Sequence, residues 1–197
     1  MLRSCFEFNH RDSPWLTKHS IEIIEQHLTA KSTVFEWGSG RSTIWFARRV
    51  KTIHSAEHDK HWFKNVSNEL ARKDLLNVTI NMIPLNVRQG QDYVHAFDTL
   101  IPPPDFILVD GKLRDLCALR SLNLLKPGGM LIVDNINRFL PSDSRSPESV
   151  PKFDKPSSDN WDKFDQITSN WCKVWTCDGI TDTALFFKPL SQEEISY

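Results

Sequence analysis

The sequence predicts an α/β fold in which helices cover both faces of a parallel, doubly wound sheet. From Thr33 onward, short apolar runs alternate with longer stretches of helical periodicity, which is typical of crossover units on a parallel sheet. The chain has 197 residues, of which 40% are hydrophobic and 25% are charged, and this is enough to bury one substantial core. We therefore expect a single domain at residues 1–197.

A packing helix at residues 14–30 is the first predicted element. Ser13 followed by Pro14 is a helix-start signal. One face of this helix is formed by residues that recur at helical spacing, namely Thr17, Ile21, Ile24 and Leu28. We expect this face to point inward. We expect the helix to precede the sheet and to pack against it.

Five apolar runs follow and are expected to form the parallel strands. They are VFEW at 34–37, TIHSAE at 52–57, VTINMI at 78–83, DFILVD at 105–110 and MLIVD at 130–134. Two helical stripes between these runs predict helices that cover the sheet. The first stripe comprises Trp62, Phe63, Val66 and Leu70, and the second comprises Leu116, Leu119 and Leu122. The turn Lys126-Pro127-Gly128-Gly129 ends the second helix.

The C-terminal third changes in character. Residues 138–160 collect Pro, Ser and Asp with few apolar residues. An insertion of this kind is either a lid over a site or a disordered segment, and we expect a mobile loop. Residues 171–188 contain two β-rich runs joined by a turn at Asp178-Gly179, which predicts a hairpin.

Charge and cysteine content narrow the possible classes of protein. The formal net charge of -1 provides no field that attracts nucleic acid or an anionic membrane, so neither partner is expected. The four cysteines form no CxxC pair, and no apolar run approaches the ~18 residues of a membrane span. We expect a soluble, cytoplasmic protein. Nothing in the sequence indicates its oligomeric state.

The stretch VFEWGSGRSTIWFA at 34–47 places two glycines between a predicted strand and a predicted helix. Gly38 and Gly40 leave the backbone bare, so a ligand can approach closely and meet free N–H groups. Ser42 or Thr43 is expected to cap the helix that begins with IWFARRV. For a glycine pair alone, the alternative is a tight turn without a ligand.

An acid at the end of the second strand strengthens the ligand prediction. Glu57 follows Glu36 by 21 residues, close to the spacing at which an acid after the second strand of a dinucleotide-binding fold meets a ribose diol. Strand, glycine pair, helix, strand and acid, in this order, predict a cofactor that contains a nucleoside.

Several motifs together resemble class I S-adenosylmethionine-dependent methyltransferases over residues 33–137. They are E-x-G-x-G at the first strand, Glu57 at the second, an apolar strand ending in Asp110, and L-L-K-P-G-G-M-L-I-V-D at the fifth. The resemblance implies a Rossmann-like, doubly wound sheet of seven strands, mostly parallel with an antiparallel last strand. In that fold the hairpin at 171–188 supplies the sixth and seventh strands.

The resemblance also implies where S-adenosylmethionine binds. Glu36, Gly38 and Gly40 are expected against the methionine part, with Glu36 near the ammonium, and Glu57 is expected to hold the ribose hydroxyls. The full set of expected cofactor-binding residues is Glu36, Gly38, Gly40, Ser42, Glu57 and Asp110. An adenine contact is expected from residues 86–91, where no single residue is favoured.

Polar residues end the fourth and fifth predicted strands. Asp110, Asp134 and Asn135 should therefore lie close together beyond the carboxyl ends of the sheet, where their oxygens suit Mg²⁺ or Mn²⁺. The trio resembles the metal ligands of catechol and caffeoyl-coenzyme A type O-methyltransferases, although the loop motifs Gly-Arg-Ser and V-D-G-K-L-R depart from those enzymes. The alternative to a metal is that Asp110 caps the following helix and Asp134 contacts substrate or cofactor directly.

Asp110, Lys112 and Asp134 are the candidate catalytic residues. Lys112 and Arg114 follow Asp110 in one loop, where a cation can orient an anionic substrate or help to deprotonate a hydroxyl. Surface salt bridges are the alternative role for these two cations.

The favoured function is methyl transfer from S-adenosylmethionine to a small-molecule acceptor, at a hydroxyl oxygen. Two alternatives remain open. One is a non-catalytic partner subunit that binds S-adenosylmethionine, and the other is an NAD-dependent oxidoreductase. The sequence does not indicate which acceptor is methylated.

Overall fold

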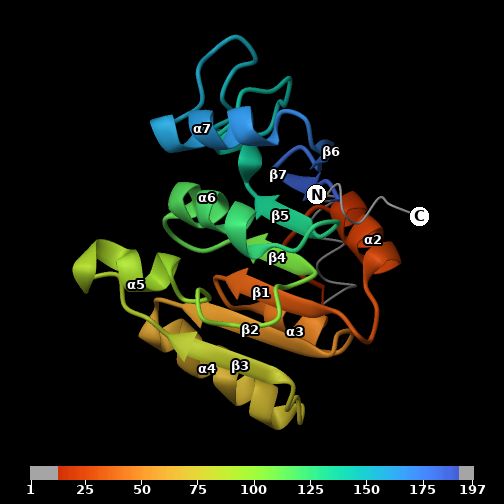
Figure 1. The fold of residues 1–197 in the computed structure, drawn as a ribbon, viewed down its shortest axis with the longest axis vertical. Coiled ribbons are helices and arrows are strands. Elements are labelled where there is room, and N and C mark those ends of the chain that lie inside the picture. The colour runs from red at the N-terminus through yellow and green to blue at the C-terminus, as the bar shows by residue number, and fades with distance from the viewer. Residues whose placement is uncertain (1–12, 191–197) are drawn as a thin grey trace.

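The computed structural model describes residues 13–190 and contains a seven-stranded sheet (Figure 1). The strands are β1 (Thr33–Trp37), β2 (Thr52–Glu57), β3 (Val78–Met82), β4 (Phe106–Val109), β5 (Met130–Asp134), β6 (Cys172–Cys177) and β7 (Asp182–Phe187). Their order is β3-β2-β1-β4-β5-β7-β6. Strands β1 to β5 pair in parallel, whereas β7 runs antiparallel to both β5 and β6. The predicted fold class, including the antiparallel last strand, is confirmed.

Helices cover both faces of the sheet. Those on one face are α2 (Lys18–His27), α3 (Arg41–Ala47) and α4 (Lys60–Arg72), and those on the other are α5 (Gln91–Val94), α6 (Arg114–Leu124) and α7 (Asp159–Thr168). Two short 3-10 helices, η1 (Arg88–Gly90) and η2 (Ile136–Arg138), follow β3 and β5. Among residues 13–190, no helix has both the length and the apolar character needed to cross a bilayer.

The core lies in two layers because successive strand residues point to opposite faces of the sheet. In β4, Phe106 and Leu108 pack with α2 and α3, whereas Ile107 and Val109 pack with α5, α6 and α7. All four side chains of this strand are buried. A central parallel strand is covered on both faces, which explains why its sequence is a continuous apolar run.

The N-terminal helix begins later than the sequence predicts. The structure starts α2 at Lys18, because Thr17 is extended (φ -63°, ψ 146°) and is held against the C-terminal hairpin. The Thr17 amide donates to Thr183 Oγ1 at 3.2 Å, and the Thr17 hydroxyl lies at hydrogen-bonding distance from Thr176 Oγ1. The helix start predicted from Ser13-Pro14 is therefore wrong, and Trp15 lies outside the helix.

The predicted loop at 138–160 contains little regular structure, but backbone hydrogen bonds tie it to its own ends. Val150 donates to the carbonyl of Asn137 at 2.8 Å, and Ser157 donates to that of Phe139 at 2.9 Å. The segment between η2 and α7 projects beside α7 at one end of the molecule (Figure 1). Its movement as a lid stays a prediction.

The loops that follow β1 and β4 pass each other backbone against backbone. Gly38 has a φ of +93°, and a Cβ on it would lie 2.7 Å from the Gly111 nitrogen and 2.8 Å from the Gly111 Cα. Real Cβ atoms do not approach this closely, so this crossing requires a glycine at position 38.

We predict that Gly38→Ala destabilises the fold more than Gly179→Ala does. Gly179 also has a positive φ, +83°, but no atom lies within 4 Å of its added Cβ. Both variants carry backbone strain of about 1–2 kcal/mol, and overlap with Gly111 adds about 1–3 kcal/mol for Gly38→Ala. Urea unfolding of the two variants measures the difference, and equal losses would contradict the close crossing.

Candidate functional site

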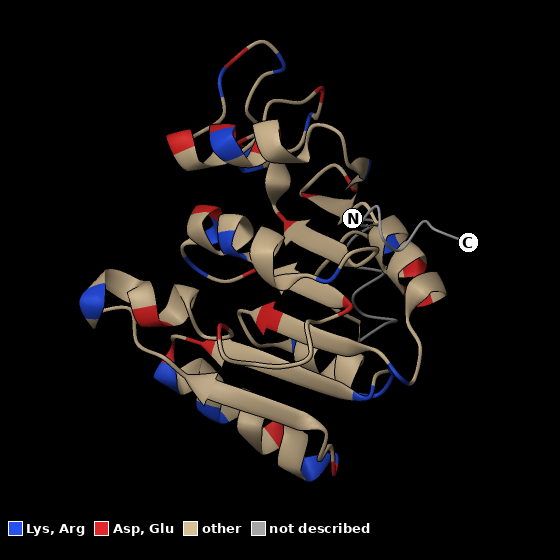
Figure 2. Ribbon diagram, viewed as in Figure 1, with Lys and Arg blue, Asp and Glu red and all other residues tan. Residues whose placement is uncertain are grey.

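A cavity of about 580 Å³ opens at the carboxyl edge of the sheet, where β1, β2 and β4 end. Acidic residues lie at or next to the ends of β1, β2 and β5 on this side (Figure 2). The wall comes from four segments and comprises Trp15; Gly38, Ser39, Gly40, Arg41 and Ser42; Glu57, His58, Asp59 and Trp62; and Asp110, Gly111, Lys112 and Arg114. Five of the six predicted cofactor-binding residues belong to this wall, and the sixth, Glu36, does not.

Glu36 lies behind the glycine loop with its carboxylate fully buried. It accepts hydrogen bonds from the hydroxyls of Ser42, Thr43 (2.5 Å) and Ser55 (2.8 Å). Burial raises the pKa of Glu36 to about 7, even though these three hydroxyl bonds oppose the shift. In this structure Glu36 anchors the loop and the start of α3 rather than forming the cavity wall.

The helix after the glycine loop begins earlier than predicted. Helix α3 starts at Arg41, and the residue before it, Gly40, donates its amide to Thr43 Oγ1 at 2.8 Å. The Ser42 hydroxyl is bonded to Glu36 instead of capping the helix. Of the two expected caps, Ser42 is wrong, because the buried carboxylate of Glu36 takes its hydroxyl, whereas Thr43 does take part in the cap through its bond from the Gly40 amide.

Glu57 lines the cavity from the end of β2, is 2% exposed, and has its carboxylate fixed by hydrogen bonds. The Ser39 amide and hydroxyl donate to its Oε2 at 3.0 and 3.1 Å. The amides of His58 and Asp59 donate to its Oε1, both at 2.8 Å. These bonds tie the acid of β2 to the glycine loop of β1, so the two sequence signals that predict a nucleoside ligand meet in one place.

Arg114 joins the ends of β4 and β5. Its Nε donates to the Gly111 carbonyl at 2.9 Å, and its Nη2 donates to Asp110 at the carbonyl (2.8 Å) and at Oδ1 (2.7 Å). Its Nη1 donates to the Asp134 carbonyl at 2.6 Å and to Asn135 Oδ1 at 2.7 Å. The guanidinium thus uses all five of its N–H groups on the residues that the sequence predicts as metal ligands and on their loop.

The two aspartates differ in what they present to the cavity. The Asp110 side chain is 28% exposed and lines the cavity, and none of the described residues donates to its Oδ2. Asp134 is 4% exposed, lies outside the wall, and accepts from Thr183 on β7 at 2.8 Å. Burial raises the pKa of both carboxyls, and Arg114 opposes the rise at each.

The predicted metal ligands Asp110, Asp134 and Asn135 do not fit a divalent cation. Two of the oxygens they would offer already accept from Arg114, and the Asp134 carboxylate is directed to Thr183. Mg²⁺ and Ca²⁺ bind oxygen at about 2.0–2.6 Å, which is closer than the guanidinium nitrogens lie to the same atoms. Across residues 13–190, no three His, Cys, Asp or Glu side chains gather as metal ligands.

A second cavity of about 340 Å³ adjoins the first, with Gly111, Lys112 and Arg114 in both walls. Phe139 and Trp161 form part of its wall and stack with ring centroids 4.9 Å apart and planes 10° apart. Lys112 is exposed between the two cavities. The predicted catalytic lysine and the start of the 138–160 segment therefore line the same cavity, which adjoins the one that Asp110 lines.

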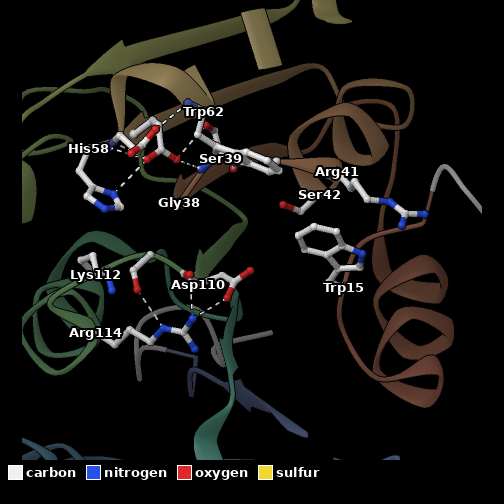
Figure 3. A pocket seen from close by; sticks show the side chains of 14 residues that line it. Trp15, Gly38, Ser39, Arg41, Ser42, His58, Trp62, Asp110, Lys112 and Arg114 are labelled. Atoms are coloured by element: carbon white, nitrogen blue, oxygen red, sulfur yellow. Dashed lines mark hydrogen bonds and ion pairs between the residues drawn. The ribbon is translucent and has the colours of Figure 1, made fainter. Parts of the chain in front are cut away.

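Aromatic residues that the sequence did not assign to the site line the mouth of the larger cavity. Trp15 stacks against Trp62 at 6.2 Å, and the Arg41 guanidinium lies 5.7 Å from the Trp15 ring centre. Figure 3 shows Trp62 and Ser39 across the cavity from Asp110, Lys112 and Arg114. Helical spacing counted Trp62 as a core residue, and nothing local marks Trp15, because its place depends on where α2 begins.

One prediction about the wall fails, and one wall residue was not predicted. The segment at 86–91, expected to contact adenine, is not part of the wall, although Gly90 packs closely on Leu113 in the loop after β4. Gly111 is a wall residue that the sequence reasoning missed. A Cβ there would lie 2.0 Å from Tyr93 Oη and 3.0 Å from the Gly38 nitrogen. The glycine directly after Asp110 was the available signal.

Comparison with known proteins gives matches among solved structures. No family model and no curated protein matches the sequence. The O-methyltransferase TomG from Streptomyces achromogenes, solved in complex with S-adenosylmethionine, is 17% identical, with a TM-score of 0.60 over 91% of this chain and 86% of TomG. A methyltransferase-like protein from Silicibacter pomeroyi is 17% identical, with a TM-score of 0.58 over 93% of each chain.

An rRNA methylase from Streptococcus thermophilus is 11% identical, with a TM-score of 0.58 over 87% of this chain and 95% of that one. At such identities the similarity shows the fold alone. The chain has the fold of S-adenosylmethionine-dependent methyltransferases, and the resemblance predicted from its motifs is confirmed at that level.

Proposed function

We propose that this chain is an S-adenosylmethionine-dependent methyltransferase that methylates a hydroxyl oxygen of a small-molecule acceptor. The observation that carries the proposal is one cavity that is lined both by Glu57, whose carboxylate is fixed, and by Asp110, whose Oδ2 accepts from none of the described residues. Similarity in fold to methyltransferases, including one solved with S-adenosylmethionine, supports it. A cytoplasmic location is part of the proposal.

The larger cavity suits the cofactor in size and in chemistry. Its volume of about 580 Å³ lies in the range of small-molecule sites. Glu57 offers carboxylate oxygens to the ribose hydroxyls, and the bare backbone at Gly38 and Gly40 lets the methionine part approach the loop. When bound, S-adenosylmethionine supplies an electrophilic methyl group on a sulfonium.

Asp110 is the proposed base. Arg114 holds its Oδ1, which leaves Oδ2 directed to the cavity and able to accept a proton from an acceptor hydroxyl. Asp110 would take the proton that the acceptor hydroxyl loses when its oxygen is methylated. Alignment of donor and acceptor supplies the rest of the acceleration.

The smaller cavity is the proposed acceptor site. The Phe139–Trp161 stack favours a planar acceptor, and Lys112, between the two cavities, favours an anionic group on it. The net charge of -1 does not favour an RNA acceptor, although an rRNA methylase shares the fold.

Methyl transfer from labelled S-adenosylmethionine to a panel of phenols, hydroxy acids and sugars tests the proposal. Product formation with one of these classes supports it. Binding of S-adenosylhomocysteine with no transfer to any acceptor would favour the non-catalytic partner subunit. Binding of NAD and not of S-adenosylhomocysteine would favour the oxidoreductase.

We predict that Glu57→Ala weakens S-adenosylhomocysteine binding by roughly 10-fold to 150-fold, because a hydrogen bond to a charged group contributes about 1.5–3 kcal/mol. Isothermal titration calorimetry measures the change. Glu22→Ala is the matched control, since Glu22 lies on α2 outside the cavity wall and is paired with Lys18. Unchanged affinity in the Glu57 variant would rule out the ribose assignment.

We predict that the methyl-transfer rate rises with pH and then levels off. The base must be ionised, and burial raises the pKa of Asp110 above the 3.8 of an ordinary aspartate, so the rising limb is displaced toward neutral pH.

Asp110→Asn keeps an oxygen for Arg114 but removes the base, and should lower the rate roughly 10²-fold to 10⁴-fold.

Single-turnover rates between pH 5 and 9 measure both effects. Asp92→Asn, at a site on α5 that is paired with Arg88, serves as the control. An Asp110→Asn enzyme with the wild-type rate and pH profile would show that another group takes the proton.

A further inference from the structure

We infer that the Arg114 guanidinium is a built-in cation that occupies the divalent-metal position expected at this edge of the sheet, so that transfer at Asp110 needs no metal. The claim that methyl transfer needs no metal rests on the proposed function. The claim that Arg114 occupies the metal position rests on the geometry alone.

Five oxygen atoms converge on this one cation. Three are the backbone carbonyls of Asp110, Gly111 and Asp134, and two are the side-chain oxygens Asp110 Oδ1 and Asn135 Oδ1, all within 2.6–2.9 Å of a guanidinium nitrogen. Carboxylate, amide and carbonyl oxygens are the ligand types that Mg²⁺ and Ca²⁺ prefer. In this chain the positive charge that these oxygens surround is the guanidinium of Arg114.

The guanidinium is a permanent occupant. Arginine side chains are not deprotonated in proteins, so the cation is always present. The Arg114 side chain is only 16% exposed, and all five of its N–H groups have acceptors. A divalent cation that bound the same oxygens would have to displace these bonds or lie against a like charge.

The carboxylates left over do not make a second metal site. Asp134 is buried and accepts from Thr183, so it is not available to the cavity. Asp110 Oδ2 is then one carboxylate oxygen beside Arg114 and close in sequence to Lys112. One oxygen next to cations is a poor ligand set for Mg²⁺, which needs several oxygens in near-octahedral geometry.

Arg114 therefore acts as a positioning residue. It fixes Asp110 through Oδ1, and it ties the loop after β4 to Asn135, whose backbone is left-handed (φ 54°) at the end of β5. A metal in the same place would hold the acceptor oxygen directly. Here the cation holds the base instead, and the acceptor oxygen meets Asp110.

Direct measurement of Mn²⁺ binding tests the inference without relying on activity. Electron paramagnetic resonance titration should detect no Mn²⁺ bound to the wild-type protein below about 1 mM, with or without S-adenosylhomocysteine. Micromolar Mn²⁺ binding that disappears in Asp110→Asn would overturn the inference. Methyl transfer should be unchanged after chelator treatment and after Mg²⁺ is added back, and a loss that Mg²⁺ restores would overturn it as well.

Removal of the guanidinium supplies the converse test. Arg114→Ala leaves the five oxygens without their cation, and this variant should bind Mn²⁺ at least about 10-fold more tightly than the wild type. Arg120→Ala, on the same helix and paired with Asp98, is the matched control and should not gain Mn²⁺ affinity. A folded Arg114→Ala protein with no gain in Mn²⁺ affinity would contradict the claim that these oxygens form a metal-like donor set.

Arg114→Gln, which keeps hydrogen-bond donors but no charge, serves as the second variant if Arg114→Ala does not fold. The same gain in Mn²⁺ binding is expected, and its absence has the same meaning. If the wild type fails to bind S-adenosylhomocysteine, the proposed function falls, whereas the Mn²⁺ titrations still decide whether Arg114 fills the metal position.

Discussion

The site depends on the reversal of strand order at β1. This strand lies between β2 and β4, and the chain leaves β1 into α3 on one face of the sheet but leaves β4 into α6 on the other. Loops that depart to opposite faces leave a crevice at the carboxyl ends of their strands. The backbone crossing of Gly38 and Gly111 sets how closely the two loops approach, so one wall of the cavity carries the acid of β2 and the other carries Asp110.

The carboxylates gathered at this edge are each stabilised differently. Glu36 is held by hydroxyls, Glu57 by backbone amides and the Ser39 hydroxyl, and Asp110 by a guanidinium. Burying a charged carboxylate without partners would cost much free energy. The partners of each acid therefore determine whether it can also bind a ligand. Glu36 supports the loop from outside the wall, whereas Glu57, 2% exposed, and Asp110, 28% exposed, belong to the cavity wall. This division suits the proposed roles, in which Glu57 binds the ribose and Asp110 accepts a proton.

Local patterns in the sequence were enough to predict the sheet and the position of the cavity. The apolar run of β4 and the glycine pair after β1 depend on neighbouring residues, so they are visible along the chain. The partners of Arg114 and the place of Trp15 could not be found in that way. Arg114 meets Asn135 across 21 positions, and Trp15 reaches the cavity because Thr17 is tied to the distant β7. The metal site is expected from residue types at strand ends, but the structure places the Arg114 guanidinium against two of the oxygens that such a site would use.

A crystal structure of the protein with S-adenosylhomocysteine is the most direct test of the account. We expect the ribose hydroxyls to lie within hydrogen-bonding distance of Glu57, the methionine part to lie along Gly38 and Gly40, and the sulfur to be directed toward Asp110 Oδ2. A ligand bound elsewhere, or a cavity that stays empty at saturating ligand, would contradict it.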